Sequence, residues 1–121
     1  MSPTSSPNPS RGKIWWVKFD PSIGSEQQKI RPAVVASVPS VGRLPLRIVV
    51  PITDWKPQYE RAPWFVELRP SSENGLSKPS GADAFQVKSV SLERFKGKAG
   101  TVTVDQMDDI AAAIALCVGA P

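Results

Sequence analysis

Residues 14–38, IWWVKFDPSIGSEQQKIRPAVVASV, hold two runs rich in β-branched and aromatic residues, joined by a mostly polar segment. The runs are IWWVKF at 14–19 and AVVASV at 33–38. Such residues favour strands, so the two runs predict a β-hairpin. A hairpin needs only two connecting residues, whereas the polar segment GSEQQKIRP at 24–32 has nine. We therefore expect this charged loop to do more than reverse the chain.

Further strand-like runs are separated by clusters of Pro, Gly and Ser, which favour turns. The expected strands cover residues 14–19, 30–37, 47–53, 65–69 and 84–90, with a short one at 101–104. Apolar residues then recur at helical spacing, at Met107, Ile110, Ala111, Ile114, Ala115 and Val118. Thr103 and Gln106 predict a capping box, Gly119 predicts the helix end, and the nearby acids suit the helix dipole.

These elements predict a single domain over residues 11–121, preceded by a flexible Ser/Pro-rich tail over 1–10. The fold class is mainly β, with a small curled sheet or partly open barrel and a C-terminal helix packed on it. No apolar run is long enough to span a membrane and the N-terminus lacks a secretory pattern. With one cysteine, Cys117, the sequence favours the cytoplasm.

Charge is distributed unevenly along the chain. The net charge is +4, but residues 105–121 hold three Asp and no Lys or Arg, so residues 1–104 carry 15 − 8 = +7. A basic body of this kind is typical of proteins that bind phosphate backbones or an acidic partner. Ordinary solubilising charge is the alternative interpretation.

The composition excludes several classes of enzyme. The chain has no His, so the common His-dependent acid, base and nucleophile systems and most zinc sites are absent. It also lacks both Gly-rich nucleotide-binding motifs, and its acids outside the helix are scattered. Cys117 lies between Leu116 and Val118 on the expected helix, where a structural thiol is the favoured interpretation. We expect neither a metal nor a cofactor.

Four segments in order resemble the MazF/PemK family of bacterial toxin endoribonucleases. Residues 12–37 contain W-V-x-F-D-P, G-x-E-Q and R-P-A-V-V, and RIVVPITD at 47–54 is similar to the family's V-P-x-T segment. FQVKSVSLERF at 85–95 and KGKAGTV at 96–102 resemble its D-Q-V-[KR]-[ST] region and the basic turn after it. The resemblance implies an SH3-like barrel, the fold of MazF, CcdB and Kid toxins. It also implies a homodimer, a cognate MazE-like antitoxin and metal-independent cleavage of single-stranded RNA.

By the same resemblance, Arg31 and Thr53 are the principal catalytic pair and Glu26 is implicated as well. The chemistry is sensible because RNA supplies its own nucleophile, the ribose 2′-OH. A forked guanidinium suits two phosphate oxygens, and the hydroxyl of Thr53 can donate to the same centre. Glu26 is open between a general base and a carboxylate that holds the loop in shape.

RNA contacts are expected around this pair and in the segment DWKPQYERAPW at 54–64, which mixes aromatic and basic residues. The candidates are Ser25, Gln27, Lys29, Trp55, Lys56, Arg61, Phe85, Gln86 and Lys88. Trp64 is expected in the core instead. Phe85 stands where many relatives carry an Asp, and Asp83 lies two residues upstream, on the same face of the expected strand. Phe85 therefore either stacks on a base or fills the core.

Two other classes of function remain in view. A gyrase-poisoning toxin of the CcdB type uses the same fold without catalysis, but relies on a C-terminal Trp-Gly-Ile, where this chain has Val-Gly-Ala-Pro. A noncatalytic SH3-like binding module would be favoured by loss of Arg31 or Thr53. Both residues are present.

Overall fold

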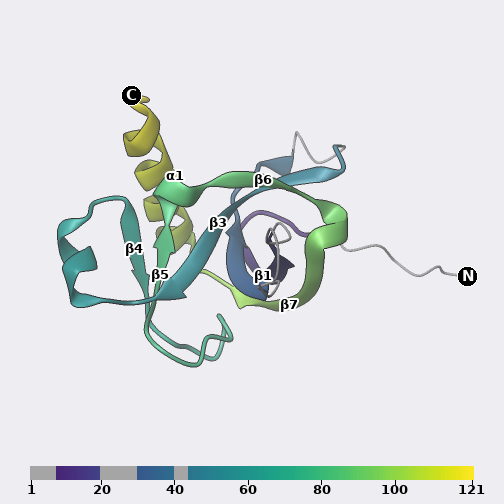
Figure 1. Ribbon diagram of the computed structural model, residues 1–121, viewed down its shortest axis with the longest axis horizontal. Helices are drawn as coiled ribbons and strands as arrows, with labels where there is room; N and C mark the ends of the chain where they lie inside the picture. Colours follow the sequence, from purple (N-terminus) through teal and green to yellow (C-terminus); the bar gives the residue numbers. More distant parts are fainter. Residues whose placement is uncertain (1–7, 20–29, 40–43) are drawn as a thin grey trace, which may run out of the picture.

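The computed structural model describes residues 8–19, 30–39 and 44–121. Within these residues, seven strands form one antiparallel sheet that curls around its first strand (Figure 1). The strands are β1 (Lys13–Lys18), β2 (Ile30–Val35), β3 (Leu46–Asp54), β4 (Phe65–Leu68), β5 (Ser80–Asp83), β6 (Lys88–Ser91) and β7 (Phe95–Thr101). Short 3₁₀ turns are η2 (Pro57–Arg61), η3 (Ala84–Gln86) and η4 (Leu92–Arg94), and the chain ends in helix α1 (Val104–Val118).

Strand β3 is the hub of the sheet. It pairs with β2 from Ala33↔Pro51 to Val35↔Val49. Its other edge pairs first with β6 and then, from Ile52 to Asp54, with β5. The last residues of β3 therefore lie where the β2 side of the sheet meets the β4–β5 side. Register shifts between β1 and β7 are typical of bulges, which bend a strand, and Figure 1 shows β7 wrapping around β1.

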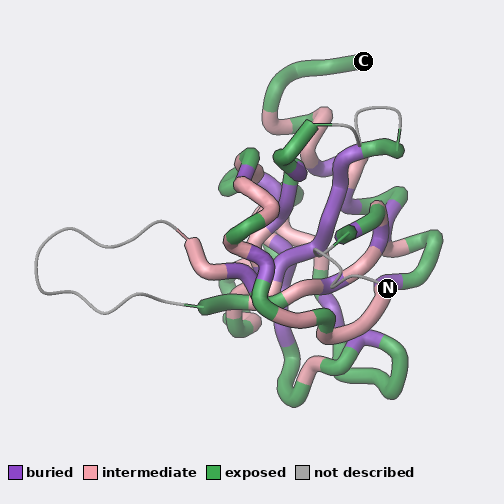
Figure 2. The backbone as a smooth tube through the Cα atoms, turned by 90° about the vertical axis from the view of Figure 1, so that its right-hand side faces the viewer, coloured by how far each residue is buried: buried purple, intermediate pink, exposed green. Residues whose placement is uncertain are grey.

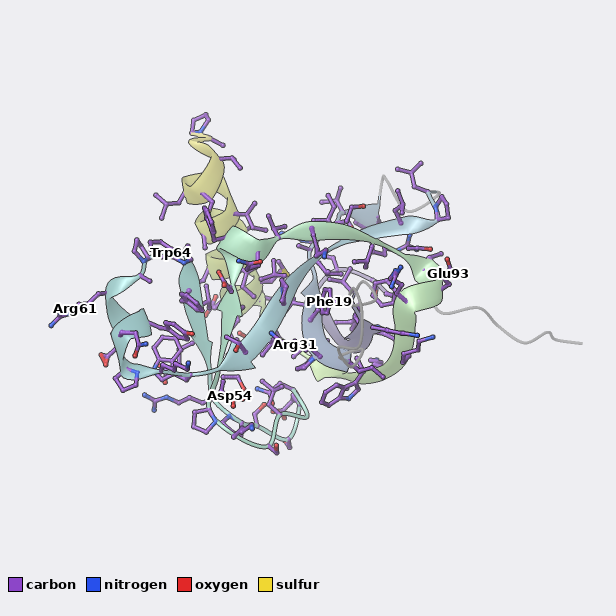
Figure 3. All side chains as sticks on the ribbon, in the orientation of Figure 1. Phe19, Arg31, Asp54, Arg61, Trp64 and Glu93 are labelled. Atoms are coloured by element: carbon purple, nitrogen blue, oxygen red, sulfur yellow. The ribbon has the colours of Figure 1, made fainter. Side chains whose placement is uncertain are left out.

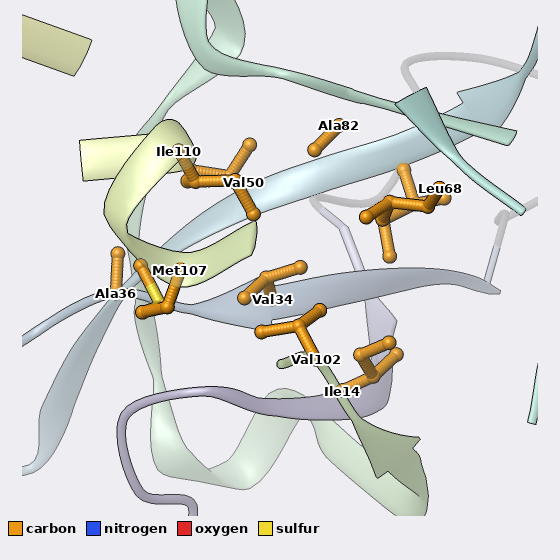
Figure 4. Packing of buried hydrophobic residues seen from close by; sticks show 10 residues of the cluster. Ile14, Val34, Ala36, Val50, Leu68, Ala82, Val102, Met107 and Ile110 are labelled. Carbon is orange, nitrogen blue, oxygen red and sulfur yellow. The ribbon is translucent and has the colours of Figure 1, made fainter. Parts of the chain in front are cut away.

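Apolar side chains are buried on both faces of the strands. One cluster lies between the sheet and α1 (Figure 4) and includes Ile14, Val34, Val50, Leu68, Met107 and Ile110. Successive strand residues point to opposite faces, so the alternate positions build another cluster. That cluster contains Val17, Ala33, Val35, Val49, Val90 and Phe95. Buried backbone accordingly runs through the middle of the molecule, with exposed turns around it (Figure 2).

Both predicted ends of α1 are confirmed. The Thr103 side chain accepts from the backbone N–H of Gln106 at 3.0 Å, and the Gln106 side chain accepts from the N–H of Thr103 at 2.9 Å. Gly119 takes the left-handed conformation, φ 70°, which favours glycine. Met107, Ile110 and Ala113 are buried, whereas Val118, expected on the buried face, is 70% exposed.

The expected mainly β fold with a C-terminal helix is confirmed, but three local predictions are wrong. The expected strand at 84–90 is instead η3 followed by β6, and strand β5 before it was missed because SGAD has little strand propensity. The basic turn expected at 96–102 is mostly part of β7, whose Gly100 packs against the backbone of a neighbouring loop. The short strand expected at 101–104 is only the end of β7, since Val104 already begins α1.

Within the tail expected at 1–10, residues 8–10 are described. Pro9 is buried, and its carbonyl accepts from Nε of Arg47 at 2.9 Å. The same buried guanidinium donates to the Asn8 side chain and to the carbonyls of Leu44 and Leu46. This stretch is thereby attached to the start of β3.

Candidate active site

Arg31 and Thr53 line the same pocket, which has a volume of about 370 Å³. The pairing of β2 with β3 explains why they come together. Carrying the register of Ala33↔Pro51 two residues further on each strand sets Arg31 across from Thr53. The Arg31 side chain is exposed, and the buried Ile52 lies in the same wall as Thr53. The site thus presents a cation and a hydroxyl on a rigid strand pair.

The loop between β4 and β5 forms the opposite wall, through residues 75–78. Asn74 is only 2% exposed and organises this loop. Its Oδ1 accepts from the backbone N–H groups of Ser71 at 3.0 Å and Leu76 at 2.9 Å, and its Nδ2 donates to the Arg69 carbonyl at 2.7 Å. This buried amide therefore has partners for both its oxygen and its nitrogen, which fixes the turn.

Two glycines let the loop approach β7 closely. Gly75 has φ 70°, and a Cβ there would collide with the backbone carbonyl of Ala99. A Cβ on Gly100 would collide with the backbone of Glu73 and Asn74. Side chains at these two positions would push the loop outward, so glycine is needed for the wall to lie where it does.

An ion pair lies at the pocket. Nζ of Lys78 is 3.2 Å from Oδ2 of Asp54, and both side chains are 63% exposed. Both residues line the pocket, together with Trp16 of β1, which is 41% exposed. Sequence reasoning missed Lys78 because only the folded loop brings it to this pocket. It missed Trp16 because its place opposite Pro32, next to Arg31, depends on the register between β1 and β2. The spacing in the chain gives no signal for either contact.

The other residues predicted for RNA are dispersed. Ser25, Gln27 and Lys29 lie outside the described residues, as does Glu26, the third catalytic candidate. Trp55 covers Gly81 and makes edge contacts with Tyr59 and Phe65, so its ring packs against the fold. Lys56 and Arg61 are exposed at η2, and Figure 3 shows Arg61 well to the side of Arg31. They are not among the residues that line the Arg31 pocket.

Phe85 and its neighbours build a separate apolar surface. Phe85 is 67% exposed, which excludes the core alternative, and Trp64, expected in the core, is 37% exposed. Their ring centroids are 6.3 Å apart. They line a pocket of about 400 Å³ with Pro63, Leu116 and Cys117. Gln86 is exposed in η3, and Nζ of Lys88 lies 5.4 Å from the ring centroid of Phe19.

Asp83 serves as the cap of η3. Its Oδ1 accepts from the backbone N–H of Phe85 at 3.1 Å. Burial raises the pKa of this carboxyl above its ordinary value of 3.8, although hydrogen bonds from the backbone N–H groups of Phe85 and Gln86 oppose the shift. The expectation that Asp83 and Phe85 share one face of a strand is wrong, because the strand ends at Asp83.

No three acidic or cysteine side chains in residues 8–19, 30–39 and 44–121 gather in a way that could hold a metal ion. In that same part of the chain, no helix is both long and apolar enough to cross a membrane.

Comparison with known proteins agrees with the geometry. Residues 10–118 match the family model described as PemK-like, MazF-like toxin of type II toxin-antitoxin system. The chain is 36% identical over 114 residues to the endoribonuclease toxin MazF of Escherichia coli, covering 92% of this chain and 95% of that protein. It is 31% identical over 112 residues to endoribonuclease MazF9 of Mycobacterium tuberculosis, covering 88% and 92%.

Solved structures show the same fold. The MazE-MazF crystal structure (Form-III) from Deinococcus radiodurans superposes with a TM-score of 0.74 and 22% identity, covering 94% of this chain and 99% of that one. The curled sheet with its C-terminal helix is therefore the MazF toxin fold. With the match of the family model over nearly the whole chain, this protein belongs to the PemK-like, MazF-like toxins of type II toxin-antitoxin systems.

Proposed function

We propose that the protein is a sequence-specific endoribonuclease toxin that cleaves single-stranded RNA, chiefly mRNA, without a metal ion and thereby inhibits translation and growth. The observation that carries the proposal is the pocket shared by Arg31 and Thr53 in a chain of this family. The relatives at 31% and 36% identity are named endoribonucleases. The reaction takes place in the cytoplasm, where mRNA is found.

In the proposed reaction, the ribose 2′-oxygen forms a bond to the adjacent phosphorus and the bond from phosphorus to the 5′-oxygen breaks. The products are a 2′,3′-cyclic phosphate and a 5′-hydroxyl. A base removes the 2′-OH proton, and an acid returns a proton to the 5′-oxygen. A guanidinium stays protonated near neutral pH, so Arg31 stabilises the phosphorane charge and transfers no proton. Thr53 donates a hydrogen bond to the same centre, and Glu26 is the candidate base.

The proposal includes two protein partners. A second copy of the chain forms a symmetric dimer, and a cognate MazE-like antitoxin neutralises the toxin. The name of the Deinococcus radiodurans structure, MazE-MazF, supports the antitoxin. The +7 charge of residues 1–104 supports an acidic antitoxin segment, because opposite charge favours association.

The test is incubation of the purified protein with single-stranded RNA in excess EDTA, followed by mapping of both new ends. We expect unchanged cleavage, with a cyclic phosphate on one fragment and a free 5′-hydroxyl on the other. Activity that EDTA abolishes and magnesium restores would overturn the metal-independent mechanism. Failure to cleave any single-stranded RNA would instead favour a noncatalytic binding protein.

A further inference from the structure

We propose that Lys78 is a phosphate-binding residue of the RNA pocket, and that Asp54 holds its ammonium group until RNA displaces the carboxylate. This inference rests on the proposed function and adds a second phosphate-binding cation to the same pocket as Arg31. The ligand class is the anionic phosphodiester of single-stranded RNA. Lys78 and Asp54 have had no role assigned so far beyond their ion pair.

Hydrogen bonds on both sides of Lys78 hold its backbone in place. The backbone carbonyl of Lys78 accepts from Oγ of Ser80 at 2.8 Å. The next carbonyl, of Pro79, accepts from the backbone N–H of Trp55 at 3.0 Å. Further back, Asn74 and the close packing of Gly75 on Ala99 fix the loop against β7. The side chain of Lys78 therefore leaves a backbone that is anchored on both sides.

The ion pair is suited to exchange rather than to stability. A pair between two side chains that are each 63% exposed contributes little, because water solvates both charges. An incoming phosphodiester offers Lys78 the same kind of oxygen partner. It also gains the guanidinium of Arg31, which the Asp54 pair does not use. When phosphate replaces the carboxylate, Lys78 therefore gives up one weak ion pair and gains a phosphate that Arg31 also contacts.

Asp54 lines the same pocket as Arg31 and Thr53, so its carboxylate lies close to where the phosphate would bind. Among the described pocket residues, the charged ones are Arg31, Asp54 and Lys78, which gives a net charge of +1. With Asp54 neutralised, that charge becomes +2. The carboxylate therefore lowers RNA affinity in two ways, by repelling phosphate and by competing for Lys78. A neutral residue at position 54 should bind RNA more tightly.

The experiment measures equilibrium binding of an RNA whose ribose is 2′-deoxy at the mapped cleavage site, so that binding is separated from cleavage. Lys78→Met is compared with Lys96→Met, which removes the same charge from an exposed lysine of β7. Nζ of Lys96 donates to the backbone of Glu93, and Figure 3 shows Glu93 at the opposite side of the molecule from Asp54. Asp54→Asn is compared with Asp105→Asn at the start of α1.

We expect Lys78→Met to weaken RNA binding about three- to fivefold, the scale of one solvent-exposed charge contact, and Lys96→Met to have less effect. The slope of log affinity against log salt should shrink by about 0.7, the loss of one phosphate contact to a single strand. Asp54→Asn should tighten binding more than Asp105→Asn does. In a Lys78→Met background this tightening should be smaller, because the competition has been removed.

The outcomes separate the two proposals. If the wild-type protein neither cleaves nor binds RNA, the proposed function fails and the role of Lys78 fails with it. If it does both but Lys78→Met binds RNA like Lys96→Met, only the role of Lys78 is overturned. Equal tightening by Asp54→Asn with and without Lys78 would show that Asp54 acts by repulsion alone, and the exchange would be rejected.

Discussion

Arg31 is an exposed residue at the start of β2, so its side chain does little for packing and its loss should affect chemistry. We expect Arg31→Ala to lower kcat/KM by an amount equivalent to about 3 kcal/mol or more, the scale of removing one preorganised donor to a developing oxyanion. Urea unfolding should be unchanged. The measurement is steady-state cleavage of a fluorescent RNA substrate alongside denaturation followed by Trp fluorescence.

Arg69→Ala is the matched control for this variant. Arg69 is an exposed arginine whose Nε lies 3.4 Å from Glu67, and it does not line the pocket. Removing the same charge there should leave cleavage nearly unchanged, because exposed ion pairs contribute little. Near-normal cleavage by Arg31→Ala would mean that Arg31 is not a catalytic residue.

Asp83 gives a prediction about pH. Its pKa is higher in the folded chain than the ordinary 3.8, chiefly because of burial, so the folded state keeps this proton at pH values where the unfolded state has lost it. The stability that follows is complete below the unfolded pKa and disappears as the pH rises through the folded one. Asp83→Asn keeps an acceptor for the Phe85 N–H without the charge. It should therefore gain stability relative to wild type between pH 3 and pH 7.

Urea unfolding of both proteins at several pH values in that interval tests this. The difference should be largest near pH 7 and smallest near pH 3, where the wild-type carboxyl is protonated in both states. A constant difference across the interval would show that ionisation of Asp83 is not linked to folding.

The loop between β4 and β5 links the fold to the site, because it is fixed by Asn74 and carries Lys78. Asn74→Ala would remove the buried partner of the N–H groups of Ser71 and Leu76 and of the carbonyl of Arg69, in three part-buried hydrogen bonds. We expect a loss of about 2 kcal/mol of unfolding free energy, since three part-buried hydrogen bonds are lost at once and each contributes about 0.5–1.5 kcal/mol. A raised KM for RNA should accompany it as the wall of the pocket shifts.

Two further variants sharpen this test. Asn74→Asp keeps an oxygen acceptor but cannot donate to the Arg69 carbonyl, so its effect should be intermediate. Ser72→Ala, in the same loop and exposed, should have little effect on either quantity. Stability lost with an unchanged KM would show that the loop supports the fold without positioning the site.

Local sequence signals predicted some elements well and others poorly. The first strands and α1 were predictable because β-branched runs, a capping box and a C-terminal glycine each have a local physical cause. Strand β5 was not predictable, because Ser80 to Ala82 are small residues with little strand propensity. They are buried because neighbouring segments cover them. Val118 is the opposite case. Its apolar side chain has the helical spacing of a buried residue, but it is 70% exposed at the end of α1.

The site was predictable in part. Resemblance singled out Arg31 and Thr53, and strand register explains why they share a pocket. Lys78 lies in a loop with no motif, and its contact with Asp54 depends on the folding of the whole segment between β4 and β5. The exposure of Phe85 excludes the core alternative, and its neighbour Trp64 comes from another segment of the chain. Contacts of this kind follow from tertiary packing alone.

Across the whole molecule, charge divides along the chain, because residues 1–104 carry +7 whereas residues 105–121 hold three Asp and no Lys or Arg. Under the proposed function, RNA and an acidic, poorly ordered antitoxin tail both bind the basic surface. A flexible anionic peptide can cover a large positive area and use the same phosphate-binding groups. The two ligands should therefore exclude one another, and tail binding should weaken as salt rises.

Competition tests this directly. A labelled, uncleavable RNA bound to the toxin is titrated with the antitoxin tail at two salt concentrations. We expect the tail to displace the RNA, with a higher midpoint at the higher salt concentration. Substitution of Arg31, Lys56 or Arg61 should weaken the binding of both RNA and tail. Of these three residues, Arg31 lines the pocket, and the other two lie outside it. A stable ternary complex with unchanged RNA affinity at saturating tail would mean that inhibition acts through another surface, because two anions cannot use the same cations at once.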